Sequence, residues 1–364
     1  MMKILSIVGT RPNFMKIAAL VDEIKKAKNV EHVLIHTGQH YDKEMSKLFF
    51  DDLQLPKPDI NLGVGSGSYG EQIGNIIIGL EKVVKEQNPD LVIVVGDVNS
   101  TFAGALVAKQ LGIQVAHIEA GLRSFDLSMP EEINRMLTDR ISDMLFTTED
   151  SGNKNLISEG VDKKNIFFVG NVMIDTLLKH KKESEKSDIL KKLSIKKENY
   201  AVLTLHRPAN VDSKKNFENI ILILEELQKK IKIVFPMHPR TKKNINALEL
   251  NKKISGMKNL VITEPLGYLD FLHLMAESKL VLTDSGGIQE ETTVLGVPCI
   301  TLRGSTERPV TVEQGTNIIV STDKNKIIKA ANKVLKGAKF KSKIPQLWDG
   351  KAAQRIIKVI LKNI

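Results

Sequence analysis

Short, continuous apolar runs recur along this sequence, and each is followed by a segment long enough for an amphipathic helix. In the first half the runs cover residues 4–8, 33–37, 91–95, 115–118, 145–148 and 166–169. Runs without polar alternation are typical of strands buried on both faces, as in a parallel sheet covered by helices on either side. The alternation of such strands with helices predicts a doubly wound α/β domain.

One interruption of this alternation predicts a second domain. Between residues 179 and 199 the chain becomes charged, and apolar runs then restart at 202–205, 233–235, 260–263, 280–283, 299–302 and 318–320. At 364 residues the chain also exceeds the size at which one hydrophobic core usually stops growing. We therefore expect Rossmann-like domains at 1–178 and 200–345, a connection at 179–199, and a C-terminal helix within 346–364 that packs back on the first domain. The carboxyl ends of the strands would face a cleft.

Composition and charge exclude several classes of protein. A net charge of +10 would suit nucleic acid, but the lysines fall on solvent faces of predicted helices and no aromatic residues interleave with them. We therefore expect no nucleic-acid partner, although the positive field would attract a small anion. No run approaches the roughly 20 apolar residues that span a bilayer, so we expect no membrane association. The single cysteine, Cys299, permits neither a disulfide nor a cysteine metal cluster and suggests a cytoplasmic protein.

The turn after the strand at 280–283 is the strongest candidate for an anion site. Ser285, Gly286 and Gly287 stand where that strand passes into a helix. Unpaired amides and the positive end of the helix dipole attract phosphate there, and glycine permits close approach. An ordinary serine-capped helix would show the same residues. The segment after the next strand, which contains Arg303 and Arg308, could bring a guanidinium to the same anion and favours the phosphate interpretation.

Acid and base candidates end several other strands. Asp97, Glu119 and His206 each follow an apolar run, and Glu131 opens a helix after Pro130. Each has a structural alternative, since Asp97 could cap the following helix and Glu131 could compensate a helix dipole. Ionisable groups gathered at strand ends favour general acid/base chemistry. No spacing such as H-E-x-x-H supports a metal site built from them.

A nicotinamide cofactor is not expected. The first strand is followed by Gly9-Thr10-Arg11-Pro12, with Lys16 one turn later, where a dinucleotide enzyme would carry G-x-G-x-x-G. A literal match at residues 65–70 follows no clear strand, and we interpret it as a flexible loop.

Seven blocks, in this order, resemble the non-hydrolysing UDP-N-acetylglucosamine 2-epimerases over nearly the whole chain. They are residues 9–12, 96–97, 117–123, 130–135, 206–207, 283–291 and 306–309. The resemblance implies a GT-B glycosyltransferase-like fold of two Rossmann-like α/β domains facing a cleft, and a homodimer that uses neither cofactor nor metal. It also implies reversible epimerisation of UDP-N-acetylglucosamine to UDP-N-acetylmannosamine, which would supply surface polysaccharide or glycan synthesis.

The resemblance also implies roles for individual residues. Catalytic residues would be Asp97, Glu119, Glu131 and His206, with Arg11 and Lys16 beside the sugar and diphosphate. Ser285, Gly286, Gly287 and Arg308 would hold the diphosphate, Glu291 the ribose, and Leu266 and Phe271 the uracil. A second, activating nucleotide-sugar would contact Gln39, His40, Arg207 and His238, although an arginine of some regulated members is missing near residues 68–70.

The chemistry of such enzymes explains the combination of acids, bases and an anion site. The C2 proton lies beside no carbonyl, so the family eliminates UDP to a 2-acetamidoglucal and adds it back after protonation from the opposite face. Two faces need at least two acid/base groups. Alternatives are a UDP-sugar glycosyltransferase, a hydrolysing epimerase that releases N-acetylmannosamine, and a nucleotide-sugar sensor without activity.

Overall fold

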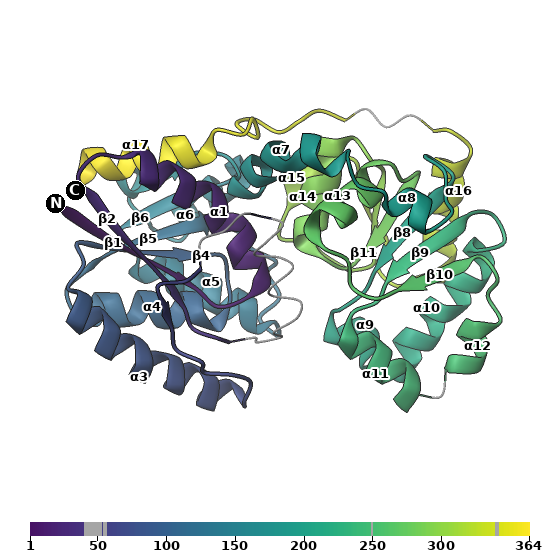
Figure 1. The fold of residues 1–364 in the computed structure, drawn as a ribbon, viewed down its shortest axis with the longest axis horizontal. Coiled ribbons are helices and arrows are strands. Elements are labelled where there is room, and N and C mark those ends of the chain that lie inside the picture. The colour runs from purple at the N-terminus through teal and green to yellow at the C-terminus, as the bar shows by residue number, and fades with distance from the viewer. Residues whose placement is uncertain (40–52, 54–56, 249, 339–341) are drawn as a thin grey trace. The chain divides into compact units, whose positions relative to one another are not determined.

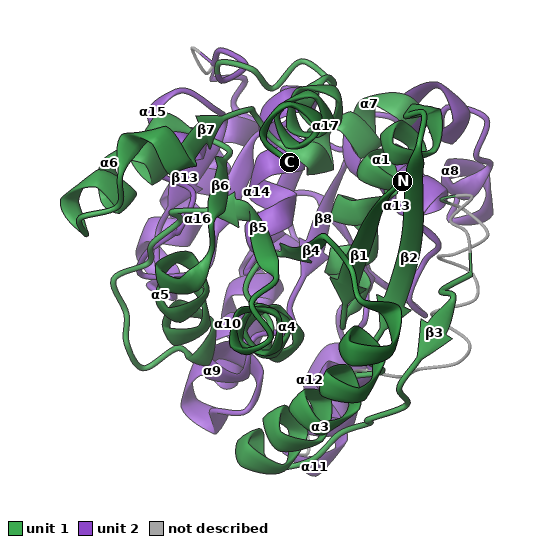
Figure 2. Ribbon diagram, turned by 90° about the vertical axis from the view of Figure 1, so that its left-hand side faces the viewer, with its two compact units in different colours: residues 1–179, 346–364 green, residues 180–345 purple. Residues whose placement is uncertain are grey.

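The computed structural model describes residues 1–39, 53, 57–248, 250–338 and 342–364 and divides into two compact units (Figure 1). Unit 1 comprises Met1–Lys179 and Gln346–Ile364, and unit 2 comprises His180–Pro345 (Figure 2). Each unit is built on one parallel sheet with helices between its strands, so the α/β class predicted from the apolar runs is confirmed.

Unit 1 contains a seven-stranded sheet of order β3-β2-β1-β4-β5-β6-β7. Alternate residues of the first strand enter different cores: Ile4 and Val8 pack with one cluster, and Leu5 and Ile7 pack with another. The sheet is therefore buried on both faces, which is why its strands are continuously apolar. The strands are β1 (Met2–Val8), β2 (Val30–His36), β3 (Ile60–Asn61), β4 (Leu91–Val95), β5 (Gln114–Ala120), β6 (Met144–Thr147) and β7 (Ile166–Phe168).

The helices of unit 1 include one from the end of the chain. They are α1 (Arg11–Lys26), α3 (Tyr69–Gln87), α4 (Asn99–Gln110), α5 (Pro130–Ile141), α6 (Asp150–Ser158), α7 (Val172–Ser184), which continues into unit 2, and α17 (Ala352–Asn363). Helix α17 packs against α1, as Figures 1 and 2 show. The Asp175 carboxylate accepts the amides of Ala352 and Ala353 at 3.1 and 2.7 Å, and burial raises the pKa of Asp175 to about 6.

Unit 2 contains a six-stranded sheet of order β10-β9-β8-β11-β12-β13. Its strands are β8 (Tyr200–Thr204), β9 (Lys232–Pro236), β10 (Leu260–Thr263), β11 (Leu280–Thr283), β12 (Cys299–Thr301) and β13 (Asn317–Ile319). Its helices are α8 (Ile189–Lys192), α9 (Pro208–Val211), α10 (Lys214–Leu227), α11 (Pro239–Ala247), α12 (Asn251–Ser255), α13 (Tyr268–Ala276), α14 (Gly286–Leu295), α15 (Pro309–Glu313) and α16 (Lys324–Leu335).

Two local features differ from the sequence-based expectations. The short strand β3 was not predicted, because a two-residue strand leaves no periodic signal. The segment 65–70 is not wholly a loop, since α3 begins at Tyr69. Ser68 and Glu71 form a capping box at this helix start, in which the Ser68 amide donates to the Glu71 carboxylate at 3.0 Å.

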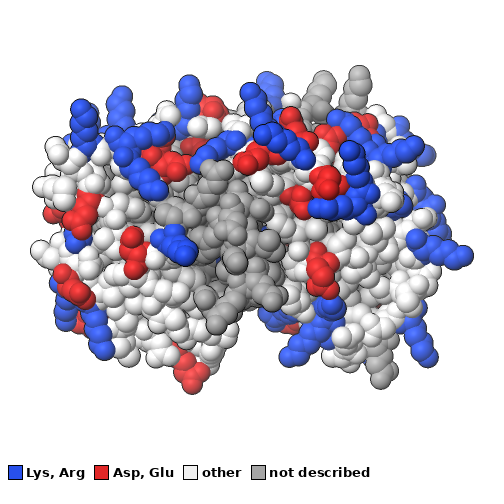
Figure 3. Space-filling model, viewed as in Figure 1, with Lys and Arg blue, Asp and Glu red and all other residues white. Residues whose placement is uncertain are grey.

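The basic residues are dispersed over the surface. On the face seen in Figure 3, Lys and Arg side chains alternate with Asp and Glu. Several form exposed pairs along single helices, such as Lys154 with Asp150 and Lys229 with Glu226. Throughout the described residues, every helix is too short or too polar to cross a membrane.

Candidate active site

A buried ion pair joins the first helix of unit 1 to the end of β5. The Lys16 ammonium contacts the Glu119 carboxylate, and the two residues are 7% and 2% exposed. Glu119 has a backbone φ of 71°, at an irregularity in the β5–β6 pairing. Left-handed backbone at a glutamate is unfavourable and tends to persist where function requires it. The irregularity redirects the Glu119 side chain toward Lys16.

The turn after β4 leaves space for this pair. Gly96 has a φ of 72°, and a Cβ atom there would lie 3.0 Å from Lys16 Nζ and 3.6 Å from a Glu119 carboxylate oxygen. Asn13 ties the same turn to the start of α1: its amide donates to the Val95 carbonyl at 3.0 Å, and its oxygen accepts the Thr10 amide at 3.1 Å. A side chain at position 96 would therefore disturb the Lys16–Glu119 pair.

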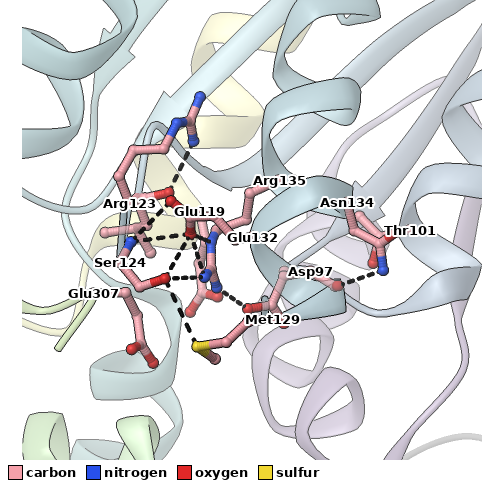
Figure 4. A network of polar contacts seen from close by, with 12 residues as sticks. Asp97, Thr101, Glu119, Arg123, Ser124, Met129, Glu132, Asn134, Arg135 and Glu307 are labelled. Atoms are coloured by element: carbon pink, nitrogen blue, oxygen red, sulfur yellow. Dashed lines mark hydrogen bonds and ion pairs between the residues drawn. The ribbon is translucent and has the colours of Figure 1, made fainter. Parts of the chain in front are cut away.

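Asp97, the next residue, is oriented by an arginine. Figure 4 shows the Arg135 guanidinium between the carboxylates of Asp97 and Glu132, with both of which it forms ion pairs. Glu132 is buried and also accepts the Ser124 amide at 2.9 Å. Burial would raise the pKa of Glu132, but the Ser124 amide and Arg135 outweigh it and hold that pKa below its ordinary value. The Asp97 side chain remains 28% exposed, so it is both fixed and accessible.

The buried side chain of His117 also holds the Gly96 turn in place. One ring nitrogen of His117 lies 2.8 Å from the Gly96 carbonyl, and the other lies 2.7 Å from Asp139. The Asp139 carboxylate also accepts the Gly121 amide at 3.0 Å and pairs with Arg123 at 2.7 Å. Burial would raise the pKa of Asp139, but His117 and Arg123 hold it below its ordinary value. His117 and Asp139 thus brace the chain on both sides of Glu119.

Arg11 and Glu131 occupy the starts of two helices. Arg11 is the first residue of α1, and Glu131 lies in the first turn of α5; both are partly exposed. Burial raises the pKa of Tyr69, and the charge of Glu131 adds to this increase, which places the two groups near each other. The roles assigned to Arg11 and Glu131 remain predictions.

In unit 2, a buried aspartate organises the end of β8. Asp284 lies after β11, and its carboxylate is 3.0 Å from His206 Nδ1 and accepts the Arg207 amide at 3.0 Å and the Asn210 side-chain amide at 3.0 Å. Burial would raise the pKa of Asp284, but His206 and the amide donors keep it below its ordinary value. Because this carboxylate accepts at Nδ1, His206 presents Nε2 to its surroundings, and the side chain is 45% exposed.

The start of α14 is partly exposed and surrounded by charged groups. Ser285, Gly286 and Gly287 are neither buried nor fully exposed, and a Cβ atom at Gly286 would lie 2.4 Å from a Glu307 carboxylate oxygen. Arg308 is buried and pairs with Glu290 at 2.5 Å. Glycine at 286 therefore leaves room for the Glu307 carboxylate beside the helix start.

The nucleoside candidates lie on two helices of unit 2, α13 and α14, and just before α13. Glu291 is buried, and its carboxylate accepts the Tyr268 hydroxyl at 3.2 Å. Burial raises the pKa of Glu291 to about 7, although the Tyr268 hydrogen bond opposes the increase. Leu266 and Phe271 lie before and within α13 and are partly exposed. The roles of these three residues with a nucleoside remain predictions.

The residues assigned to a second nucleotide-sugar are divided between the units. Gln39 is buried, and its side-chain oxygen accepts the Ser100 hydroxyl at 2.8 Å. The rings of His206 and His238 lie 6.5 Å apart, beside Arg207. His40 lies outside the described residues. The activating site remains a prediction.

Sequence reasoning missed several residues on which the candidates depend. In unit 1, the residues that hold Asp97 and Glu119 in place are Arg135, His117 and Asp139. In unit 2, Asp284 contacts His206, and Glu307 lies beside Gly286. His117, Arg135, Asp284 and Glu307 lie within the seven blocks that resemble the family, but the sequence assigned them no role, and Asp139 lies outside the blocks. Arg135 also follows Glu132 at the spacing that brings ionic side chains together on a helix. Within the part of the chain that the structure describes, no three His, Cys, Asp or Glu side chains gather as a metal ion would need.

Comparison with known proteins identifies the family. The profile described as UDP-N-acetylglucosamine 2-epimerase matches residues 22–361. The UDP-N-acetylglucosamine 2-epimerase of Methanocaldococcus jannaschii is 46% identical over 99% of both chains. Its crystal structure in complex with UDP-GlcNAc and UDP matches with a TM-score of 0.94, at 45% identity over 100% of both chains. The UDP-2,3-diacetamido-2,3-dideoxy-D-glucuronate 2-epimerase of Pseudomonas aeruginosa is 38% identical over 99% of this chain and 100% of its own.

These matches confirm the GT-B-like fold class and the resemblance drawn from the seven sequence blocks. The buried carboxylates at the strand ends and the polar start of α14 are thus parts of an epimerase, and the chain belongs to the UDP-N-acetylglucosamine 2-epimerase family.

Proposed function

We propose that this protein interconverts UDP-N-acetylglucosamine and UDP-N-acetylmannosamine without hydrolysis. The observation that carries the proposal is the pair of carboxylates, Glu119 and Asp97, fixed at neighbouring strand ends by the buried cations Lys16 and Arg135. Such groups suit proton transfer, because their positions are set before the substrate arrives. A sensor that only binds nucleotide would not need them.

The reaction that these groups support is an elimination followed by an addition. A base removes the C2 proton, and the electrons of the C2–H bond form a C1–C2 double bond. The C1–O bond breaks, and its electron pair leaves on the diphosphate oxygen of UDP. Return of UDP to C1, with a proton delivered to the other face of C2, completes the inversion without consuming water.

Unit 2 supplies groups that suit the departing UDP. The first amides of α14 and the positive end of its dipole favour negative charge at Ser285, Gly286 and Gly287. Because His206 Nδ1 donates to Asp284, Nε2 can accept a proton and, once protonated, can return it or donate a hydrogen bond. We propose that Arg308 and Glu291 complete the site at the diphosphate and the ribose.

Two relatives of this chain are named for different sugars. The Pseudomonas aeruginosa relative is named for a diacetamido uronate, whose C2 would be inverted by the same bond changes. We propose UDP-N-acetylglucosamine because the Methanocaldococcus relative named for it is more similar to this chain.

Deuterium exchange tests the proposal. The protein is incubated with UDP-N-acetylglucosamine in D₂O, without added cofactor, and the C2 proton and the products are followed by NMR. We expect deuterium at C2 and UDP-N-acetylmannosamine. Free N-acetylmannosamine with UDP would identify a hydrolysing enzyme, and absence of exchange would refute the epimerase. Turnover of only the diacetamido uronate in a parallel incubation would reassign the sugar.

We also propose a homodimer. An apolar group on unit 1 is exposed to solvent: Phe125 and Leu127 are 79% and 65% exposed, and Ile133, Met136 and Leu137 on α5 are each about two-fifths exposed. Clustered apolar side chains of this size favour protein contacts. Light scattering after gel filtration should give twice the mass of the chain. The Leu137→Glu variant should have the mass of a single chain.

A further inference from the structure

We propose that Arg303 is an anion-binding arginine of the diphosphate site and that Glu307 positions its guanidinium. Arg303 then binds the diphosphate of free UDP more strongly than that of UDP-sugar. This inference rests on the proposed function, since it concerns the same diphosphate. Arg303 follows β12, the strand hydrogen-bonded to β11, so it leaves the sheet beside the turn that begins α14.

The guanidinium of Arg303 is buried and only partly satisfied. Its side chain is 8% exposed, and Nη2 lies 2.7 Å from Glu307 Oε2. Its other terminal nitrogen, Nη1, is buried and makes no hydrogen bond to any residue that the structure describes. A buried donor on a charged group is expensive to leave unpaired, and native proteins rarely tolerate one without a ligand or water to accept from it. This nitrogen therefore indicates a place for an acceptor.

Glu307 locates the Arg303 guanidinium near the start of α14. One Glu307 oxygen is bound to Arg303, and the other lies 2.4 Å from the position that a Cβ atom of Gly286 would take. The carboxylate therefore lies between the Arg303 guanidinium and the first residue of α14. A planar guanidinium held by that carboxylate, near the start of a helix, suits the binding of a phosphate group.

The charge on Glu307 explains why an arginine is needed. Burial would raise the pKa of Glu307, but Arg303, Arg308 and Arg207 outweigh it and hold the pKa well below its ordinary range. Glu307 is thus an anion beside a site proposed for another anion. Arg303 offsets this repulsion, and Glu307 in return fixes the direction of the guanidinium. Glu307 is accordingly a positioning residue.

Free UDP should gain more from Arg303 than UDP-sugar does. In the sugar nucleotide each phosphate carries one charge, whereas the terminal phosphate of free UDP carries nearly two near pH 7. A fixed guanidinium interacts more strongly with the larger charge. Arg303 would therefore stabilise the leaving group and retain it for return to C1.

Binding measurements on two variants test the inference. Arg303→Met removes the guanidinium but keeps an unbranched side chain, and Arg303→Lys keeps the charge opposite Glu307. Lys229→Ala is the control, since it removes one positive charge from an exposed pair of unit 2. Dissociation constants for UDP and UDP-N-acetylglucosamine are measured by calorimetry and that for uridine by NMR. The thermal unfolding midpoint confirms that each variant is folded.

We expect Arg303→Met to weaken UDP binding by roughly 10- to 100-fold, the range of a charge-assisted hydrogen bond. UDP-N-acetylglucosamine should lose less, uridine should be unaffected, and Arg303→Lys should lie between the wild type and the methionine variant. Unchanged UDP binding in both variants would overturn the inference, as would an equal loss for uridine. Failure of the wild type to bind UDP would instead refute the proposed function.

Discussion

The strand ends of the two units are built differently. In unit 1 the candidate acids and bases are paired with buried cations, as Glu119 is with Lys16 and Asp97 with Arg135. In unit 2 the candidate groups are more open: His206 is 45% exposed and Ser285, Gly286 and Gly287 are partly exposed, while the carboxylates around them, Asp284 and Glu307, are buried.

This difference matches two kinds of task. Proton transfer to carbon needs carboxylates whose orientation is fixed, and buried salt bridges provide that rigidity at a cost in desolvation. Anion binding uses backbone amides and guanidinium groups that must remain accessible to a ligand. The proposed function thus assigns proton chemistry to unit 1 and the charge of a diphosphate to unit 2.

Glu119→Gln should separate the two tasks most clearly. We expect turnover to fall roughly 10²- to 10⁴-fold, the usual worth of a general acid or base, while the dissociation constant for UDP stays within twofold. Glu31→Gln is a matched control, because that glutamate is half-exposed and pairs with Lys3 on the surface of unit 1. A comparable loss of UDP affinity in Glu119→Gln would contradict the division between the units.

Arg135→Met tests whether rigidity in unit 1 depends on buried charge. It leaves the Glu132 carboxylate buried without its cation, so we expect the free energy of unfolding to fall by about 3–5 kcal/mol. Urea denaturation gives this value for the variant and for Arg140→Met, a change at an exposed arginine of the same helix. A loss below about 1 kcal/mol would mean that the ion pairs contribute little to the fold.

The protonation of Glu291, a buried acid of unit 2, should make the stability of the protein depend on pH. Its folded-state pKa of about 7 exceeds the ordinary value, so the folded protein retains a proton that the unfolded chain releases. The free energy of unfolding should therefore decline as pH rises from about 4.5 to 7, by on the order of 2–3 kcal/mol, and then level off.

Glu291→Gln should remove that decline. The contribution of Asp175, whose pKa is also raised, has the same sign and is present in both proteins, so the difference between their stability curves isolates Glu291. If the ionised carboxylate accepts ribose hydroxyls, UDP affinity in the wild type should increase several-fold through pH 7. Parallel curves for the two proteins would show that Glu291 does not titrate in this range.

Among the variants proposed here, we expect Gly286→Ala to have the smallest effect. The added Cβ would lie 2.4 Å from the Glu307 carboxylate, so that carboxylate must move. We expect UDP affinity to weaken roughly tenfold, about the value of one hydrogen bond, with little loss of stability. Gly304→Ala is the matched control, because a Cβ there would meet open space. Equal effects of both variants would argue against a specific role for the Gly286 position.

Much of the fold could be predicted because buried parallel strands leave a strong pattern. Residues 91–95, 260–263 and 280–283 were predicted with the bounds that the structure shows, since each run is apolar and ends at a turn. The strand β3 could not be predicted, because its two residues are held by pairing with β2 rather than by their own composition. Helix α3 begins within a glycine-rich segment because Ser68 and Glu71 cap it.

The candidate site was predictable only in part. Polar residues after apolar runs identify Asp97 and Glu119, but nothing in the sequence indicates that Glu119 has a left-handed backbone. Asp284 and His206 are 78 residues apart and meet only because β8 and β11 are neighbours in the sheet. Partners of this kind depend on topology, which local patterns do not specify.

The discontinuity of unit 1 has a consequence for biosynthesis. Its core includes Ile356, Ile357 and Ile360 of α17, which the ribosome adds only after the whole of unit 2 has been made. Domains usually fold as the chain emerges, so unit 2 can complete its core while unit 1 still exposes the apolar surface of α1 that α17 will cover. Truncation just before residue 346 should therefore produce a chain that aggregates through unit 1, and nascent unit 1 is where a chaperone would be needed.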